Sequence, residues 1–410
     1  MGWRKMSMNG YARRLVSGFL LFLLLVTMIP GGTAEPPEAE PYAEEITAGC
    51  TWGGNSKESK KNTFQLMTDR DVSTYFALKE KNGFLTIDSP EPIYGVSVML
   101  YDRFNQDYSY DLQAEGADGE WKTIGQSKYL SNWHPLEEPV NRIRILTTSR
   151  ERLRIAELQL FGEGKKPEEV QDWQDLDKAD IMLLACHPDD EVLWFAGLMP
   201  VYADRGYKVQ LAMMTPEYEE RQLELLQSAW HCGMRYYPYF IGLHDKNGHK
   251  NLARQYTLWK GKTRVHRLVT ECFRKFKPEV VVTHGEGGEY GHSAHKATAD
   301  SAKTCIKYAA NSRKYPESAK EYGTWQVKKL YLHEYEKNKV SMDWTQPLES
   351  FGGKTGFDIA GEAFLYHVSQ VKIGHYEFKP VGDHDNTAFG LYYTAVGPDQ
   401  GKNDFMENIP

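Results

Sequence analysis

The sequence predicts two domains, an all-β sandwich of jelly-roll type followed by an α/β domain with a Rossmann-like parallel sheet. The chain of 410 residues is long for one domain and of ordinary length for two. Short β-type runs separated by turn residues fill residues 46–162, a pattern typical of a sandwich. From residue 178 onward, apolar strand-like runs alternate with helical stretches, which indicates a parallel sheet covered by helices.

The first 34 residues have the pattern of a cleavable signal peptide and belong to neither domain. A basic start precedes an apolar run over residues 15–29, and Gly32, Thr33 and Ala34 are the small residues that a signal peptidase needs. The apolar run is shorter than the usual membrane span of ~20 residues, so a retained anchor is the lesser alternative. We therefore expect a secreted protein, extracellular or associated with the cell wall, that meets a membrane only through an uncleaved signal segment.

Charge and cysteine content narrow the class of protein further. The chain has 49 basic and 56 acidic residues, and loss of the predicted signal segment would leave 45 basic residues. Such an acidic product argues against nucleic acid or anionic lipid as the main partner. The five cysteines are odd in number and lack CxxC spacing, which favours buried thiols, although an exported protein could pair Cys232 with Cys272.

Residues 43–163 form the predicted sandwich. Two of its segments resemble discoidin-type, galactose-binding-like jelly rolls. Met67 to Tyr75 is similar to the D-G-D-x-x-T segment, with Arg70 in place of the usual glycine, and Arg154 to Gly162 is similar to the closing I-x-E-L-x-x-x-G strand. The resemblance implies a carbohydrate-binding role, in which exposed aromatic rings would stack on sugars; the alternative is that the rings fill the core. These aromatic residues are Tyr75, Phe76, Tyr101, Phe104, Tyr108, Trp121, Tyr129 and Trp133.

A charged linker over residues 163–178 separates the sandwich from the α/β domain, which we place at residues 178–410. Pro278 is expected to end a helix just before the strand that leads to His284. Because no GxGxxG follows the first strand, the sheet is not expected to bind a dinucleotide. Strands are predicted over residues 181–184, 208–215, 236–242 and 279–283, helices over residues 192–205, 218–230 and 262–276, and a closing β element over residues 386–397.

A polar turn follows the first predicted strand of the α/β domain and contains His187, Asp189, Asp190 and Glu191. Open α/β sheets bind ligands at the carboxyl ends of their strands. One imidazole and three carboxylates in so short a turn call for a positive partner, and a divalent metal is the simplest one. The alternative is a solvated loop whose acidic residues cap the next helix.

A second loop that contains histidines favours a metal site over a solvated loop. The strand over residues 279–283 leads into His284, a glycine-rich segment over residues 285–291, and then His292 and His295. In a parallel sheet both strand ends lie on the same edge, so the two loops can meet. His284 could be a ligand or a structural histidine, and Cys186 could be a fourth ligand or a small buried residue under the site.

Together the HPDDE turn and the glycine-rich HxxH segment resemble the PIG-L/LmbE family of zinc-dependent N-acetylglucosaminyl deacetylases, over about residues 178–400. The resemblance implies His187, Asp190 and His295 as zinc ligands. It also implies Asp189 as the general base and His292 as the general acid or oxyanion stabiliser. The family often has Pro-Asp between the two late histidines where this chain has Ser293 and Ala294, which affects the surroundings of the ligands more than the ligands.

The chemistry of these residue types agrees with those roles. Two histidines and one aspartate leave a coordination position open on zinc, as catalytic sites require, and zinc lowers the pKa of a bound water to about 7. The predicted reaction is hydrolysis of the N-acetyl amide of N-acetylglucosamine-type sugars or glycans by a metal-bound water. Other divalent metals suit the same ligands. Substrate contacts are predicted for Arg221, where the family places an arginine, and for Glu289 in the glycine-rich loop; His367 is expected to border the pocket.

Two other functions use the same sequence features. A zinc amidase that cuts another N-acyl group or a conjugate would need the same metal chemistry, and only the shape of the pocket would separate it from a deacetylase. A secreted glycan-binding protein without activity is the other alternative, and the complete set of five site residues argues against it. The sequence leaves the exact substrate, the native metal and the oligomeric state open.

Overall fold

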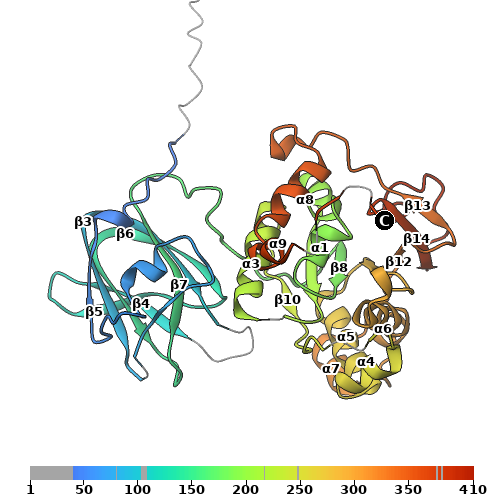
Figure 1. Ribbon diagram of the computed structural model, residues 1–410, viewed down its shortest axis with the longest axis horizontal. Coiled ribbons are helices and arrows are strands. Elements are labelled where there is room, and N and C mark those ends of the chain that lie inside the picture. The colour runs from blue at the N-terminus through green and yellow to red at the C-terminus, as the bar shows by residue number, and fades with distance from the viewer. Residues whose placement is uncertain are drawn as a thin grey trace, which may run out of the picture. The chain divides into compact units, whose positions relative to one another are not determined.

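A computed structural model describes residues 40–410 except 80, 103–108, 217, 247–248, 375–376 and 380–381. The predicted signal segment therefore lies outside the described residues. Figure 1 shows a body of antiparallel strands and a body of strands and helices. No helix within the described ranges is long and apolar enough to cross a bilayer.

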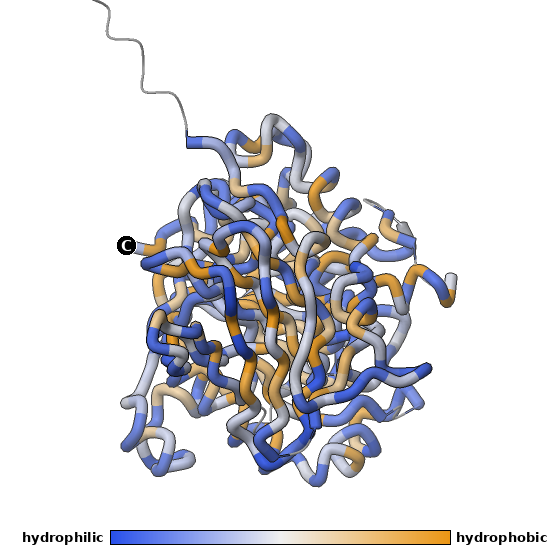
Figure 2. The backbone as a smooth tube through the Cα atoms, turned by 90° about the vertical axis from the view of Figure 1, so that its left-hand side faces the viewer, coloured by the Kyte–Doolittle hydropathy of each residue, from blue (hydrophilic) through white to orange (hydrophobic). Residues whose placement is uncertain are grey.

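The first body is one antiparallel sheet in the order β2-β7-β3-β6-β4-β5, with β1 paired to β3. Its core consists of alternating apolar side chains such as Leu85, Ile87, Ile143 and Ile145, all fully buried. Figure 2 shows apolar stretches along the strands and mostly hydrophilic connecting loops. The strands are β1 (Thr51–Gly54), β2 (Phe76–Ala77), β3 (Phe84–Leu100), β4 (Tyr110–Glu115), β5 (Trp121–Gln126), β6 (Ser131–Thr147) and β7 (Arg154–Phe161).

Two of the short β-type runs in residues 46–162, at residues 84–87 and 96–100, belong to the single long strand β3. The register of its pairing with β6 shifts between Asp88 and Gly95, and the strand continues through this irregularity. The local sequence pattern indicates a turn there instead. The sheet agrees with an all-β domain, and its jelly-roll topology stays a prediction.

The aromatic rings of this domain that the structure describes pack against other side chains. Tyr75 stacks on Tyr101 with ring centroids 4.6 Å apart, and the Arg154 guanidinium lies over both rings. Trp121 lies under Arg144, and Phe76 is fully buried. Phe104 and Tyr108 lie outside the described residues. Contacts within the protein therefore explain the rings whose surroundings the structure describes. Carbohydrate binding by this domain stays a prediction.

The second body contains a seven-stranded sheet in the order β10-β9-β8-β11-β12-β14-β13. The first five strands in this order pair in parallel, and the last two pair antiparallel. The strands are β8 (Ile181–Ala185), β9 (Val209–Met213), β10 (Tyr239–Phe240), β11 (Val280–Thr283), β12 (Lys329–His333), β13 (Lys339–Ser341) and β14 (Ala388–Thr394).

Helices cover both faces of this sheet (Figure 1). Alternate residues of β8 enter two different cores, Leu183 one and Leu184 the other, which explains why this strand is apolar throughout. The helices are α1 (Asp190–Leu193), α2 (Leu198–Asp204), α3 (Glu219–His231), α4 (Leu252–Leu258), α5 (Lys262–Phe276), α6 (Ser293–Ala309), α7 (Pro316–Tyr322), α8 (Gly356–Phe364) and α9 (Val368–Ile373).

Helix α5 has the predicted bounds, but the helix expected over residues 192–205 is two short helices, α1 and α2. The chain turns between them at Ala196, which has a φ of 31°, and at Gly197. A Cβ atom at Gly197 would lie 2.7 Å from the Trp344 ring, so this glycine lets a tryptophan from far along the chain pack against the turn. All five cysteines are free and buried, which agrees with the thiols expected.

We expect His134 in β6 to make stability depend on pH. The residue is buried with its Nε2 2.7 Å from the Tyr110 hydroxyl, and burial lowers its pKa from 6.5 to about 4. As the pH falls, His134 therefore takes up a proton in the unfolded chain before it does so in the folded protein. The free energy of unfolding is highest above the unfolded pKa of His134 and decreases as the pH falls toward about 4. This group should remove about 2 kcal/mol from the free energy of unfolding between about pH 7 and about pH 5.

Urea unfolding of the full chain at the two pH values measures this loss. The variant His134→Gln keeps a polar partner for Tyr110 but cannot be protonated, so its stability should change less with pH. An equally steep change in the variant would contradict the assignment.

Candidate active site

The polar turn after β8 and the loop after β11 meet at one edge of the parallel sheet. The two strands are neighbours, with Leu184 paired to Thr283. The Thr283 hydroxyl donates to the Leu184 carbonyl at 2.7 Å, and the Cys186 N–H donates to His284 Nε2 at 3.0 Å. The strand order of the sheet reverses between β8 and β11, which is where open α/β sheets form their binding crevice.

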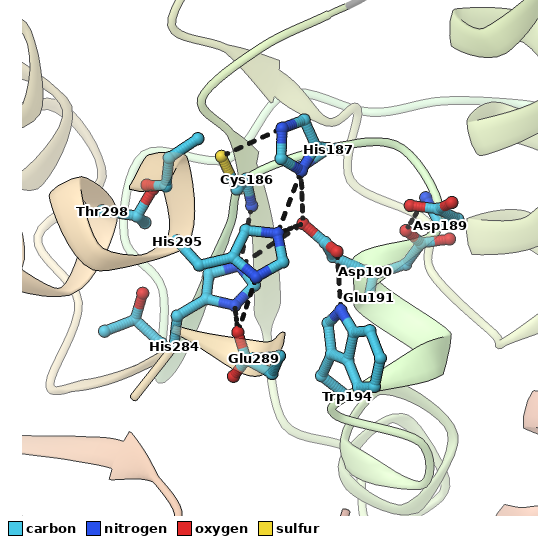
Figure 3. A network of polar contacts seen from close by, with 12 residues as sticks. Cys186, His187, Asp189, Asp190, Glu191, Trp194, His284, Glu289, His295 and Thr298 are labelled. Atoms are coloured by element: carbon cyan, nitrogen blue, oxygen red, sulfur yellow. Dashed lines mark hydrogen bonds and ion pairs between the residues drawn. The ribbon is translucent and has the colours of Figure 1, made fainter. Parts of the chain in front are cut away.

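Three side-chain atoms from the two loops converge at this edge (Figure 3). Nδ1 of His187 lies 3.1 Å from Oδ2 of Asp190 and 3.1 Å from Nε2 of His295, and the last two atoms are 3.3 Å apart. Ligands about 2.1 Å from a tetrahedral ion are about 3.4 Å from one another. The triangle therefore has the dimensions of three ligands on one zinc-sized ion.

Buried charge accompanies this triangle. Burial alone would raise the pKa of Asp190, but His295 and His187 hold it well below its usual range. Oδ1 of Asp190 accepts a hydrogen bond from the Trp194 indole at 2.7 Å, which leaves Oδ2 for an ion. Trp194 is thus a partner of the predicted ligand that the sequence pattern did not point to.

The second nitrogen of His187 points away from the triangle. Nε2 lies 3.4 Å from Oδ1 of Asp245 and 3.6 Å from Sγ of Cys186. A hydrogen on Nε2 would serve Asp245 and leave the Nδ1 lone pair for a metal, as is usual for metal-binding histidines. Cys186 lies beside the nitrogen that faces away, and burial raises the pKa of its thiol to about 11. This placement favours the small buried residue over a fourth ligand.

Asp189 lies apart from the triangle (Figure 3). Its backbone has a φ of 121°, and its N–H donates to Glu191 Oε2 at 2.8 Å. Oδ2 of Asp189 lies 3.2 Å from the Arg221 guanidinium. Burial raises the pKa of Asp189 to about 7, with Arg221 opposing the rise. The residue is therefore a carboxyl group that can both accept and release a proton near neutral pH.

His292 precedes α6 and its ring lies beside the rings of two predicted ligands. The ring centroids are 4.9 Å from that of His187 and 4.7 Å from that of His295. Burial, together with the charges of these two histidines, lowers the pKa of His292 to about 3, so the ring is neutral at ordinary pH. Its Nδ1 has no hydrogen-bond partner among the described residues. A neutral imidazole with a free nitrogen fits hydrogen bonding to an oxyanion better than delivery of a proton.

A pocket of ≈ 210 Å³ opens over these residues. Tyr290 on its wall is 43 % exposed and is held at a φ of 43°. Arg221 also lines the pocket, as its predicted substrate role requires. The lining residues are His187, Asp189, Asp190, Leu193, Trp194, Arg221, Asp245, Tyr290, His292 and Gln370.

Comparison with known proteins identifies the region that forms this site. Residues 182–306 match the model of the PIG-L family, described as GlcNAc-PI de-N-acetylase. Residues 182–306 form a PIG-L family domain. The matched region starts in β8 and ends in α6, so it includes both loops that meet at the pocket.

The relatives of the PIG-L domain include two curated enzymes and a solved structure. A 1D-myo-inositol 2-acetamido-2-deoxy-alpha-D-glucopyranoside deacetylase of Catenulispora acidiphila is 26% identical over 43% of this chain and 62% of its own length. A mycothiol S-conjugate amidase of Streptomyces coelicolor is 40% identical over 15% of this chain and 20% of its own. The chain thus matches less than two thirds of either relative. The N,N'-diacetylchitobiose deacetylase of Pyrococcus horikoshii has 18% identity and a TM-score of 0.37, over 47% of this chain and 71% of that one.

Glu289 and His367 lie away from the pocket that the sequence predicted them to contact or to border. Glu289, predicted to contact substrate, is 2% exposed, and its carboxylate accepts from three histidines instead of facing the pocket. This placement argues against a contact with substrate. His367 is fully buried behind the site, where its Nε2 lies 2.6 Å from Glu191. Glu191 also accepts a hydrogen bond from the Asp189 N–H, so the pair of Glu191 and His367 helps to hold the predicted base in position.

Asp245 and His333 are the further site residues that the sequence analysis missed. Asp245 follows the short strand β10, and His333 is the last residue of β12. Neither belongs to a recognisable motif, and the only signal available was a polar residue at the carboxyl end of a strand.

Metal binding can test the assignment of the ligands. The variant Cys186→Ala should bind one zinc per chain as the unmodified protein does, because Sγ faces the wrong nitrogen of His187. His295→Ala removes one corner of the triangle and should weaken zinc by more than the roughly 10–100-fold that loss of an outer partner costs. Competition with a chromophoric chelator measures both. Loss of zinc from the cysteine variant alone would overturn the ligand set.

Proposed function

We propose that this protein is a secreted metal-dependent deacetylase that hydrolyses the N-acetyl amide of N-acetylglucosamine-type sugars or glycans. The observation that carries the proposal is the ligand triangle of His187, Asp190 and His295 at a pocket that also contains Asp189 and His292. A three-residue set that leaves a coordination position open is the arrangement of catalytic metal sites. Relatives that act on amide bonds agree with this reaction class.

Zinc is the metal that the donor set suits best, since two imidazoles and one carboxylate are common zinc ligands, and iron, cobalt or nickel would also fit. When bound, the ion would polarise the amide carbonyl and acidify water. The buried carboxylate of Asp190 supplies the negative charge that a divalent cation needs in so dry a site.

Asp189 is the residue placed to move protons in this reaction. It lines the pocket, takes no part in the ligand triangle and is held by Arg221 and by Glu191. In the proposed reaction its carboxylate takes a proton from the attacking water, and the same proton is then available to the leaving amine. The contact with Arg221 holds the carboxylate in place while it does so.

His292 is placed to stabilise the charge that develops on the amide oxygen. A neutral imidazole donates one hydrogen bond, and a donor aimed at a developing oxyanion lowers the barrier to amide hydrolysis. We therefore favour oxyanion stabilisation over general acid catalysis for this residue, because its pKa is lowered to about 3.

An amidase that acts on another N-acyl or conjugate substrate is the second candidate. The 40% identity with a mycothiol S-conjugate amidase over 62 residues supports it. The same ligands, base and oxyanion donor would serve both reactions, so the distinction depends on what the pocket wall of Trp194, Asp245 and Tyr290 accepts. The predicted export of the protein favours an extracellular glycan as substrate.

Release of acetate is the direct test of the proposed function. The purified chain, loaded with zinc, should release acetate from N-acetylglucosamine, chitin oligomers or peptidoglycan, and a chelator should stop the release. Acetate that persists after full removal of the metal would refute the metal-dependent mechanism. Release of a different acid, with no acetate from any of these sugars, would support the amidase.

The role of Asp189 can be tested separately. Asp189→Asn keeps the size of the side chain but cannot take a proton, so kcat should fall by roughly 10²–10⁴-fold. Zinc content should remain at the level of the unmodified protein, because Asp189 lies outside the triangle. If the variant kept its kcat, another residue would have to be the base.

A further inference from the structure

Three imidazole rings converge on the buried carboxylate of Glu289, and Figure 3 shows two of them, those of His284 and His295. Oε2 lies 2.7 Å from Nδ1 of His284 and 2.7 Å from Nδ1 of His295, while Oε1 lies 2.7 Å from Nδ1 of His333. All four side chains are at most 2 % exposed. None of His284, Glu289 and His333 lines the ≈ 210 Å³ pocket, and Glu289 and His333 border a different cavity of ≈ 330 Å³.

The partners of the remaining nitrogens locate the hydrogens. Nε2 of His284 accepts the Cys186 N–H, so Nδ1 of this ring carries a hydrogen and donates it to Glu289. A hydrogen on Nδ1 of His295 would likewise be donated to Glu289 and would leave Nε2, which faces Asp190 and His187, with a lone pair for an ion. Nε2 of His333 lies 3.1 Å from the carbonyl oxygen of Asp385, which only accepts, so this nitrogen carries a hydrogen.

We propose that Glu289, held between His284 and His333, keeps His295 in the tautomer and orientation needed to bind the metal. This inference rests on the proposed function, because it assigns to Glu289 a positioning role in the same site. Glu289 fixes the Nδ1–H of His295, which leaves the Nε2 lone pair directed at the ion. His333 contacts the other carboxylate oxygen of Glu289 and the Asp385 carbonyl, and so holds the carboxylate in place.

A second metal ion among His284, Glu289 and His295 is the competing explanation, since these side chains also lie close together. The hydrogen bonds oppose it. His284 already accepts at Nε2, so its Nδ1 carries the hydrogen and has no lone pair for a metal. The 2.7 Å separations between Nδ1 and the carboxylate are also shorter than the about 3.4 Å expected between two ligands on one zinc.

Two substitutions of Glu289 separate the charge from the hydrogen bonds. In Glu289→Gln the amide oxygen can still accept from His284 and His295, while the amide nitrogen would face Nδ1 of His333. In Glu289→Leu no acceptor remains for any of the three rings. Loss of outer partners typically weakens metal binding by 10–100-fold. We expect the zinc dissociation constant to rise about tenfold in the glutamine variant and about 100-fold in the leucine variant.

A matched control is available at the other end of β11. Glu279 is also a buried carboxylate, 6 % exposed, and pairs with Lys178 and Lys328 at 2.8 and 3.0 Å. Glu279→Gln removes a buried charge from the residue that precedes the same strand, without touching the metal site. Its zinc dissociation constant should stay within about twofold of the unmodified protein, since it contacts no ligand.

A double-mutant cycle with His333→Leu tests whether His333 acts through Glu289. In the unmodified background this change releases one oxygen of the Glu289 carboxylate, so zinc binding should weaken. In the Glu289→Leu background no carboxylate remains for His333 to hold, so the further change should be smaller by at least about fivefold. Equal effects in the two backgrounds would overturn this role of His333.

The tautomer of His295 is a readout that a merely structural role would not move. Nitrogen-15 NMR of the zinc-loaded full chain should show the hydrogen of His295 on Nδ1, and the leucine variant should lose this single state. Zinc affinity and tautomer unchanged in both Glu289 variants would overturn the proposal, as would an equal loss of affinity in the Glu279 control. Failure of the proposed function is distinguishable, because it would appear as absence of acetate release from the unmodified protein with zinc bound.

Discussion

The candidate site depends on the parallel pairing of β8 with β11. These strands are separated by almost one hundred residues in the sequence, and their register places Leu184 beside Thr283. The bonds from the Thr283 hydroxyl and the Cys186 N–H then hold the two strand ends together. Because His187 directly follows Cys186 and the loop that leads to His295 begins at His284, the register determines whether His187 and His295 can share an ion.

Burial of so many ionisable groups is the main cost of this arrangement, since an unpaired buried charge is strongly unfavourable. Hydrogen-bond partners of the buried carboxylates offset this cost. Glu191 accepts from the Asp189 N–H and from Ser228 and pairs with His367, while Glu289 accepts from three histidines. Such hydrogen-bonded networks are rigid, and rigidity is what a metal ligand set needs.

The metal ligands and most of the pocket wall come from the same region of the chain. The ligands, Asp189 and His292 come from two loops within the matched PIG-L region. The wall residues Trp194, Asp245 and Tyr290 also lie within that region, whereas Gln370 from α9 lies outside it. Because Trp194 and Asp245 contact the ligands Asp190 and His187, a change of substrate pocket at these two positions would also affect the ligands.

The sequence by itself determined the elements whose signal is local. The apolar period of residues 262–276 and the following Pro278 predicted the bounds of α5, and a buried strand followed by charged residues predicted the turn that contains His187. The tertiary structure decided what depends on distant partners. Trp344 packs against Gly197, where the helix expected over residues 192–205 is interrupted. His333 on β12 contacts Glu289, which is a buried hydrogen-bond acceptor and not the expected sugar contact. Hydrophobic period and turn residues act over a few positions, whereas burial and hydrogen bonding are set by strands that pair across the whole domain.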